Sequence, residues 1–83
     1  MIKAEETIKI QFDESNLSMI VEYQPATERT LYDVCDLNGR IVKTGTIEEK
    51  ITKIDTSDLS AMHYILLILD GDRVSSRKFK LSA

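Results

Sequence analysis

The most reactive side chains in this 83-residue chain are one cysteine and one histidine. Cys35 lies between Val34 and Leu37 in an apolar stretch, and nothing in the spacing pairs it with His63 as a catalytic thiol and base. A single cysteine excludes an intrachain disulfide, and one cysteine with one histidine falls short of a zinc ligand set. We therefore predict a buried packing thiol, no metal or other cofactor, and no enzymatic activity.

Two carboxylates flank a glycine in Asp70-Gly71-Asp72, a spacing that could bring both to one calcium ion. Calcium takes about six to eight oxygen ligands, so this tripeptide supplies too few even with Asp33 or Asp36 added. Aspartate and glycine are also typical of tight turns between strands. A turn is the favoured interpretation, and a calcium site is the less favoured alternative.

The C-terminal stretch 73–83 carries four basic side chains and no acid, which gives it a charge of +4. Residues 1–33 carry −4 and residues 34–72 carry −3, for a total of −3. A pI near 5.0 argues against a general polyanion binder, so we expect no nucleic-acid partner. The basic stretch is either a contact surface for a partner or a solvated edge strand whose lysines discourage edge-to-edge pairing.

These charges must be positioned by β-strands, because apolar and polar residues alternate along much of the chain. Alternation is strict in 7–12, where Ile8, Ile10 and Phe12 share one face, and Leu17 is predicted to share a face with Met19. Further strands are expected at 17–23, 30–37, 40–47, 51–54, 62–69 and 74–81. Seven short strands with frequent turns predict an all-β antiparallel sandwich, in one domain over residues 1–83. Aromatics are only 6% of the chain, so we expect a core of Ile, Leu, Val and Met.

The turns between these strands carry their own signals. Asn38-Gly39 is the strongest hairpin signal, because both residues tolerate positive φ in a tight turn. Gly45 is a candidate β-bulge, and the loop 55–60 has room for one helical turn. Residues 62–69 are apolar on both faces, as is typical of a central strand covered on each side.

Several of these motifs occur in an order that resembles a known family. They are the segments Asp36–Val42 (DLNGRIV), Ile54–Leu59, Tyr64–Leu66, Asp70–Arg73 and Arg77–Lys80. Over about residues 17–81 they resemble the C-terminal sorting domain of the type IX secretion system of Bacteroidetes. The segment Leu59–Tyr64 departs from that family's pattern by lacking its proline and glycine.

The resemblance implies a seven-stranded, immunoglobulin-like sandwich that is recognised by an outer-membrane translocon and has no enzymatic role. It implies a recognition strand made of Gly71, Arg73, Arg77, Lys78 and Lys80. It also implies that the central hairpin of Asp36, Asn38 and Gly39 is structural. The alternative is a stand-alone soluble module of the same fold that binds or assembles with another protein and has no role in secretion.

The expected partner is a protein, either a translocon or another protein, and the chain itself is expected to be a monomer or a weak homodimer through a sheet edge. No apolar window approaches the length of a membrane span. The first ten residues hold acids where a secretory leader has its apolar core. As written, the chain is therefore expected in the cytoplasm, or at the cell surface or outside the cell if it is part of a larger precursor.

Overall fold

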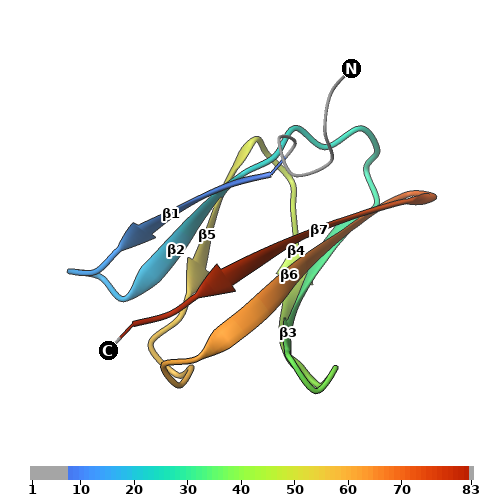
Figure 1. Ribbon diagram of the computed structural model, residues 1–83. Coiled ribbons are helices and arrows are strands. Elements are labelled where there is room, and N and C mark those ends of the chain that lie inside the picture. The colour runs from blue at the N-terminus through green and yellow to red at the C-terminus, as the bar shows by residue number, and fades with distance from the viewer. Residues whose placement is uncertain (1–7, 83) are drawn as a thin grey trace.

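The computed structural model describes residues 8–82 and consists of seven antiparallel strands in two sheets (Figure 1). The strands are β1 (Lys9–Asp13), β2 (Ser18–Glu22), β3 (Thr30–Asp36), β4 (Ile41–Thr46), β5 (Ile51–Asp55), β6 (His63–Asp70) and β7 (Arg73–Lys80). The predicted all-β antiparallel sandwich is confirmed. Within residues 8–82 there is no helix, so Asp55 ends β5 and residues 56–60 form a non-helical turn. Thr7, expected in the first strand, lies outside the described residues.

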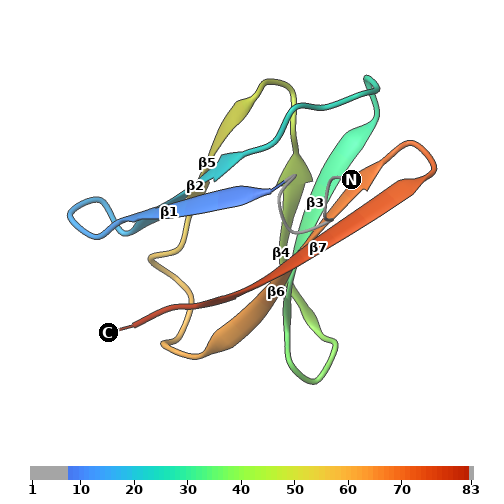
Figure 2. The ribbon, with the colours of Figure 1, turned by 45° about the horizontal axis from the view of Figure 1, so that its top comes forward.

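The two sheets differ in size and pack face to face (Figure 2). The smaller has the order β1-β2-β5, and the larger has the order β4-β3-β6-β7. The edges β1 and β7 lie on the same side of the sandwich, where Arg77 Nη1 donates a hydrogen bond of 2.8 Å to the Ile8 carbonyl. Near the opposite edge, Lys43 Nζ in β4 lies 3.1 Å from Asp58 Oδ1 in the loop after β5. Polar contacts thus join the sheets at both sides.

Apolar and aromatic side chains fill the space between the sheets. Met19 and Leu66 are fully buried. The core is not built from the expected Ile, Leu, Val and Met alone, because all three tyrosines and Phe79 are at most 9% exposed. The Tyr64 ring stacks on Phe79 with a centroid distance of 5.6 Å. A small sandwich gains a large buried area from each ring, so a few aromatics suffice.

The β1–β2 turn differs from the sequence prediction at Leu17. Leu17 was expected on the buried face of β2, but it precedes that strand, has φ of 50° and is 57% exposed. Its amide nitrogen lies 3.4 Å from the Glu14 carbonyl, which closes the turn. The left-handed backbone is uncommon for a leucine, and period-two alternation gives no warning of it. Met19, Val21 and Tyr23, which alternation places on one face of this strand, are buried.

Two further expectations for the larger sheet were wrong. The register shift in the β3–β4 pair lies between Val34 and Cys35, not at Gly45. A Cβ at Gly45 would lie 2.6 Å from the Tyr32 ring, so this glycine makes room for a buried aromatic side chain. β6 is covered on its inner face, but its outer residues Ile65 and Leu67 are only half-buried in the described structure.

Candidate recognition surface on the C-terminal strand

β7 lies at the edge of the four-stranded sheet and pairs with a strand on one side only, which is β6. The pairing runs without a register shift from Asp70 opposite Arg73 to His63 opposite Lys80. Since an antiparallel edge strand turns every second backbone N–H and C=O away from its neighbour, β7 presents unpaired polar groups along its free side. The position at an edge agrees with both sequence interpretations of the basic stretch.

The predicted recognition residues divide between the two faces of β7. Residues directly opposite each other in a ladder share a face, and Arg77 pairs with the fully buried Leu66. Arg77 therefore lies on the core side, where its guanidinium bonds to the backbone at Ile8 and ties β1 to β7. Arg73 shares this side with its partner Asp70, at the exposed start of the strand.

Lys78 and Lys80 lie on the opposite, outward face of β7. Their partners in β6 are Ile65 and His63, which alternate with the buried residues of that strand. Both lysines are exposed. The ammonium groups of Lys78 and Lys80 are therefore on the outward face of β7. The guanidinium groups of Arg73 and Arg77 are on its core side.

The β6–β7 turn is held by Asp70, which is only 1% exposed. Its Oδ2 accepts hydrogen bonds of 2.7 Å from the Tyr23 hydroxyl and from the Ala26 backbone N–H. Its Oδ1 accepts hydrogen bonds from the Thr27 backbone N–H and hydroxyl and from the Thr30 hydroxyl, at 2.7–3.0 Å. Asp70 was interpreted as a turn residue, but its carboxylate instead fastens the β2–β3 loop to the end of β6.

Burial by itself would raise the pKa of the Asp70 carboxyl, but the hydrogen bonds from Ala26, Thr27, Tyr23 and Thr30 outweigh it and hold the pKa well below 3.8. Burial and the hydrogen bond to Asp70 raise the pKa of Tyr23 to about 12. The carboxylate is therefore ionised and its donors are fixed, which makes this cluster a structural anchor.

Gly71 is required by the same turn. It has φ of 62°, and a Cβ at this position would lie 3.1 Å from Thr27 Cγ2. A side chain here would combine an unfavourable backbone conformation with a close contact to the anchored loop. This geometry gives Gly71 a structural reason to be glycine.

The central hairpin is built differently from its prediction. Gly39 has φ of 85°, but Asn38 is not among the described residues with positive φ. The Gly39 N–H donates to the Asp36 carbonyl at 3.0 Å, and Asp36 Oδ1 accepts from the backbone N–H groups of Asn38 and Arg40, each at 2.9 Å. Three residues rather than two separate Asp36 from Arg40, and only the glycine takes the left-handed conformation.

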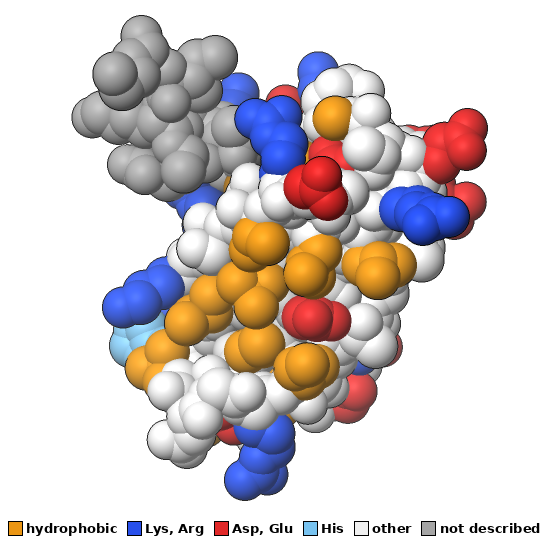
Figure 3. Space-filling model, turned by 90° about the vertical axis from the view of Figure 1, so that its right-hand side faces the viewer, with side chains coloured by type: hydrophobic (Ala, Val, Ile, Leu, Met, Phe, Trp, Pro, Cys, Tyr) orange, Lys and Arg blue, Asp and Glu red, His pale blue; other side chains and the backbone are white. Residues whose placement is uncertain are grey.

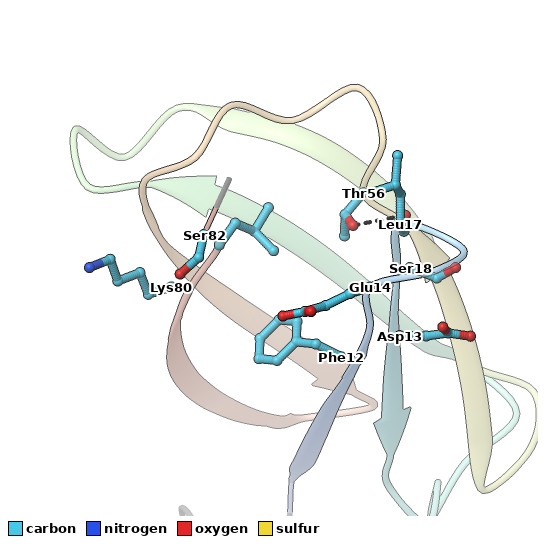
Figure 4. Close-up of a pocket in the computed structure, with 9 residues that line it drawn as sticks. Phe12, Asp13, Glu14, Leu17, Ser18, Thr56, Lys80 and Ser82 are labelled. Atoms are coloured by element: carbon cyan, nitrogen blue, oxygen red, sulfur yellow. Dashed lines mark hydrogen bonds between the residues drawn. The ribbon is translucent and has the colours of Figure 1, made fainter.

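A cavity of about 270 Å³ opens beside the end of β7 (Figure 4). Phe12 and Leu17 contribute apolar walls, and Thr56 Oγ1 donates to the Leu17 carbonyl at 2.9 Å. Lys80 lies at the rim with its side chain directed away from the other labelled residues. The described lining offers carboxylates, hydroxyls and one lysine but lacks a nucleophile paired with a base.

The remaining reactive residues lie apart from β7. Cys35 is 7% exposed, which confirms its predicted burial, and it pairs with Ile65 rather than with His63. Burial, followed by the nearby Asp33 and Asp36, raises the pKa of its thiol, which disfavours the reactive thiolate. Residues 8–82 contain no cluster of three or more metal-ligating side chains. A search of the same residues for membrane-spanning helices finds none.

Comparison with protein families matches residues 4–81 to the secretion system C-terminal sorting domain. The match covers nearly the whole chain and extends further toward the N-terminus than the motifs at 17–81. The chain belongs to this family. The resemblance noted from the ordered motifs is therefore confirmed, as is the link to type IX secretion in Bacteroidetes. No curated protein matches the chain by sequence.

The segment that departs from the sorting-domain pattern still places its tyrosine in the core. Tyr64 is 2% exposed, and its hydroxyl donates a hydrogen bond of 2.7 Å to the Ser60 carbonyl. The Leu59 N–H donates to the Thr56 carbonyl at 3.0 Å, which closes a turn just before this segment. The loop thus places Tyr64 in the core although it lacks the proline and glycine of the family pattern.

Proposed function

We propose that this member of the sorting-domain family is a non-enzymatic address, which a protein translocation apparatus recognises through β7. The observation that carries the proposal is the outward placement of Lys78 and Lys80 on an edge strand. Gly71 and Arg77 serve this surface indirectly by holding the turn and the strand in place. Arg73 adds a third exposed charge at the start of β7.

Recognition at this surface is compatible with the fold because the two lysines make no ion pair or hydrogen bond in the structure described here. Exposed ammonium groups on flexible stems are suited to meet acidic groups of a partner. Lysines on an edge strand also hinder pairing with a second copy. Both effects favour a specific protein partner over self-association.

The direct test is export of a reporter. The reporter, preceded by a signal peptide, is fused to the N-terminus of the 83-residue chain and expressed in a type IX-competent host. We expect the reporter at the cell surface or in the medium, and retention of the same fusion in a strain lacking the type IX translocon. A fusion that stays in the periplasm with its domain folded would overturn the proposal.

A stand-alone interaction module of the same fold is the second candidate function. It is favoured by one observation, the half-buried apolar residues on the outer face of β6. Such a module would bind its partner equally well in a host without type IX secretion. The export test separates the two candidates, because only the first predicts dependence on the translocon.

A further inference from the structure

The two sheets of the sandwich present different outer faces to their surroundings. On the three-stranded sheet, the outward positions are largely polar or charged, with Ile20 and Ile51 as apolar members. On the four-stranded sheet, the register places six apolar side chains outward that are half-buried or exposed: Leu31, Ile41, Ile65, Leu67, Leu69 and Val74. Cys35 lies on the same face but is only 7% exposed. Figure 3 shows hydrophobic side chains gathered into one patch on this side of the molecule, with an acidic group among them.

The patch extends across all four strands. Leu31, Leu69 and Val74 lie in one row across β3, β6 and β7, and Val74 is 65% exposed. Ile41 in β4, which is 57% exposed, lies beside Cys35 at the other corner. An antiparallel sheet with one solvated face normally has polar residues there. Contiguous apolar patches bounded by polar groups mark sites of protein contact.

Charged groups within and beside the patch define what can cover it. Asp33 lies in the middle, opposite Leu67, and its Oδ1 accepts a hydrogen bond of 2.8 Å from the Thr44 hydroxyl. A covered carboxylate needs further hydrogen-bond donors, and lipid chains supply none. Along one side of the patch, Lys78 and Lys80 face outward and would attract acidic groups of a partner.

We propose that the outer face of the four-stranded sheet docks a partner protein whose surface is apolar at its centre, with a donor opposite Asp33 and carboxylates opposite Lys78 and Lys80. This inference rests on the proposed function, since the partner is taken to be a component of the export apparatus. It extends the recognition surface from the two lysines to the apolar face beside them. A second copy fits less well, because its equivalent face offers Asp33 as the single acid against two lysines.

The test places a carboxylate in the patch without disturbing the core. Val74→Asp and Leu31→Asp alter side chains that are 65% and 48% exposed, so both variants are expected to fold. Ile51→Asp is the matched control, because Ile51 is 52% exposed on the outer face of the other sheet. We expect each patch variant to lower reporter export by about tenfold or more, since an unpaired charge would be buried at the contact. The control should stay within about twofold of the wild type.

The outcomes separate the two proposals. If the wild-type fusion is not exported, the proposed function fails and the docking surface falls with it. If the wild type is exported and both patch variants, shown to be folded by circular dichroism, are exported equally well, the docking surface alone is overturned.

A photo-crosslinking amino acid at position 74 identifies what covers the patch. In exporting cells we expect an adduct with a protein other than the chain itself, lost in a translocon-deficient strain and not formed from position 51. An adduct with a second copy alone would overturn the proposal. Binding of the purified chain to vesicles of phosphatidylcholine and phosphatidylglycerol, abolished by Val74→Asp, would overturn it in favour of a lipid surface.

Discussion

The hairpins at Asp36–Arg40 and Asp70–Arg73 use the same residue types but satisfy them in different ways. Each has an aspartate before the turn and a glycine with positive φ. The Asp36 carboxylate accepts backbone N–H groups of its own turn. The Asp70 carboxylate instead accepts groups from the β2–β3 loop, more than forty residues earlier in the chain.

This difference shows that how clearly a turn is signalled in the sequence does not indicate how much that turn contributes to the fold. Asp36-Leu37-Asn38-Gly39 is the stronger hairpin signal, yet the hydrogen bonds of the Asp36 carboxylate stay within its own turn. We expect the loss of one of them to leave the rest of the fold in place. Asp70-Gly71 is the weaker signal, yet it joins one end of β6 to the loop between the two sheets. The strand that leaves this anchored turn is β7, which carries the proposed recognition surface.

The largest effect is expected at Asp70. Asp70→Asn puts an NH₂ group among donors that require an acceptor, so we expect a loss of about 3–5 kcal/mol in the free energy of unfolding. Chemical denaturation measures this loss. Asp72→Asn, in the same turn but exposed, is the matched control and should change stability by less than about 0.5 kcal/mol. Equal effects from the two variants would remove the distinction between the hairpins.

The pH dependence of stability tests the same anchor. Because the pKa of Asp70 in the folded state lies below 3.8, its stabilising effect is complete above that value and declines as the pH falls below it. The stability difference between the wild type and Asp70→Asn, which has no carboxyl to titrate at this position, should narrow as the pH falls from about 5 toward 2, because the unfolded wild type takes up a proton before the folded one does. A constant difference over this range would show that folding does not lower the pKa of Asp70.

An intermediate effect is expected at Gly39. Gly39→Val puts a β-branched residue at φ of 85°, where a Cβ meets no neighbour within 4 Å, so the penalty is purely conformational. We expect a loss of about 1–3 kcal/mol, seen as a lower melting temperature. Gly39→Asn should lose much less, because asparagine tolerates the left-handed region. Identical melting temperatures for Gly39→Val and the wild type would show that the turn is misassigned.

A smaller effect is expected at Asp36. Asp36→Ala removes two hydrogen bonds to backbone N–H groups and the ion pair with Arg40, whose Nε lies 3.9 Å from Asp36 Oδ2. The backbone hydrogen bonds from Asp36 N–H to the Arg40 carbonyl and from Gly39 N–H to the Asp36 carbonyl remain. We expect a loss of about 0.5–1.5 kcal/mol by denaturant unfolding, because the freed N–H groups are exposed to water. A loss as large as that at Asp70 would contradict the comparison between the two hairpins.

The sequence predicted the seven strands and both hairpins because alternation and turn residues are local properties. It could not predict the burial of Asp70, whose donors lie forty or more residues away, nor the contact of Arg77 with the backbone at Ile8. Those contacts depend on how the sheets stack. One feature of the sequence pointed to the proposed docking surface, namely that residues 62–69 are apolar on both faces of the strand. In the structure the outer face of β6 has no layer that covers it, so its apolar side chains are only half-buried.

From the sequence, we considered the four basic residues near the C-terminus as one group. Period-two alternation separates Lys78 and Lys80 from Arg73 and Arg77, and β6–β7 pairing shows which pair faces outward. This division could have been read from the sequence once Phe79 was placed in the core, because Lys78 and Lys80 are its neighbours on each side.

The proposed recognition by outward lysines is tested most directly by measuring stability and export on one variant. Lys78→Ala combined with Lys80→Ala should change the free energy of unfolding by less than about 0.5 kcal/mol, because both side chains are exposed. The account predicts that this folded variant loses most of its export, whereas the matched pair Lys50→Ala and Lys53→Ala, around β5 of the other sheet, retains it. Normal export of the Lys78 and Lys80 variant would contradict the account and leave the basic strand as a solvated sheet edge.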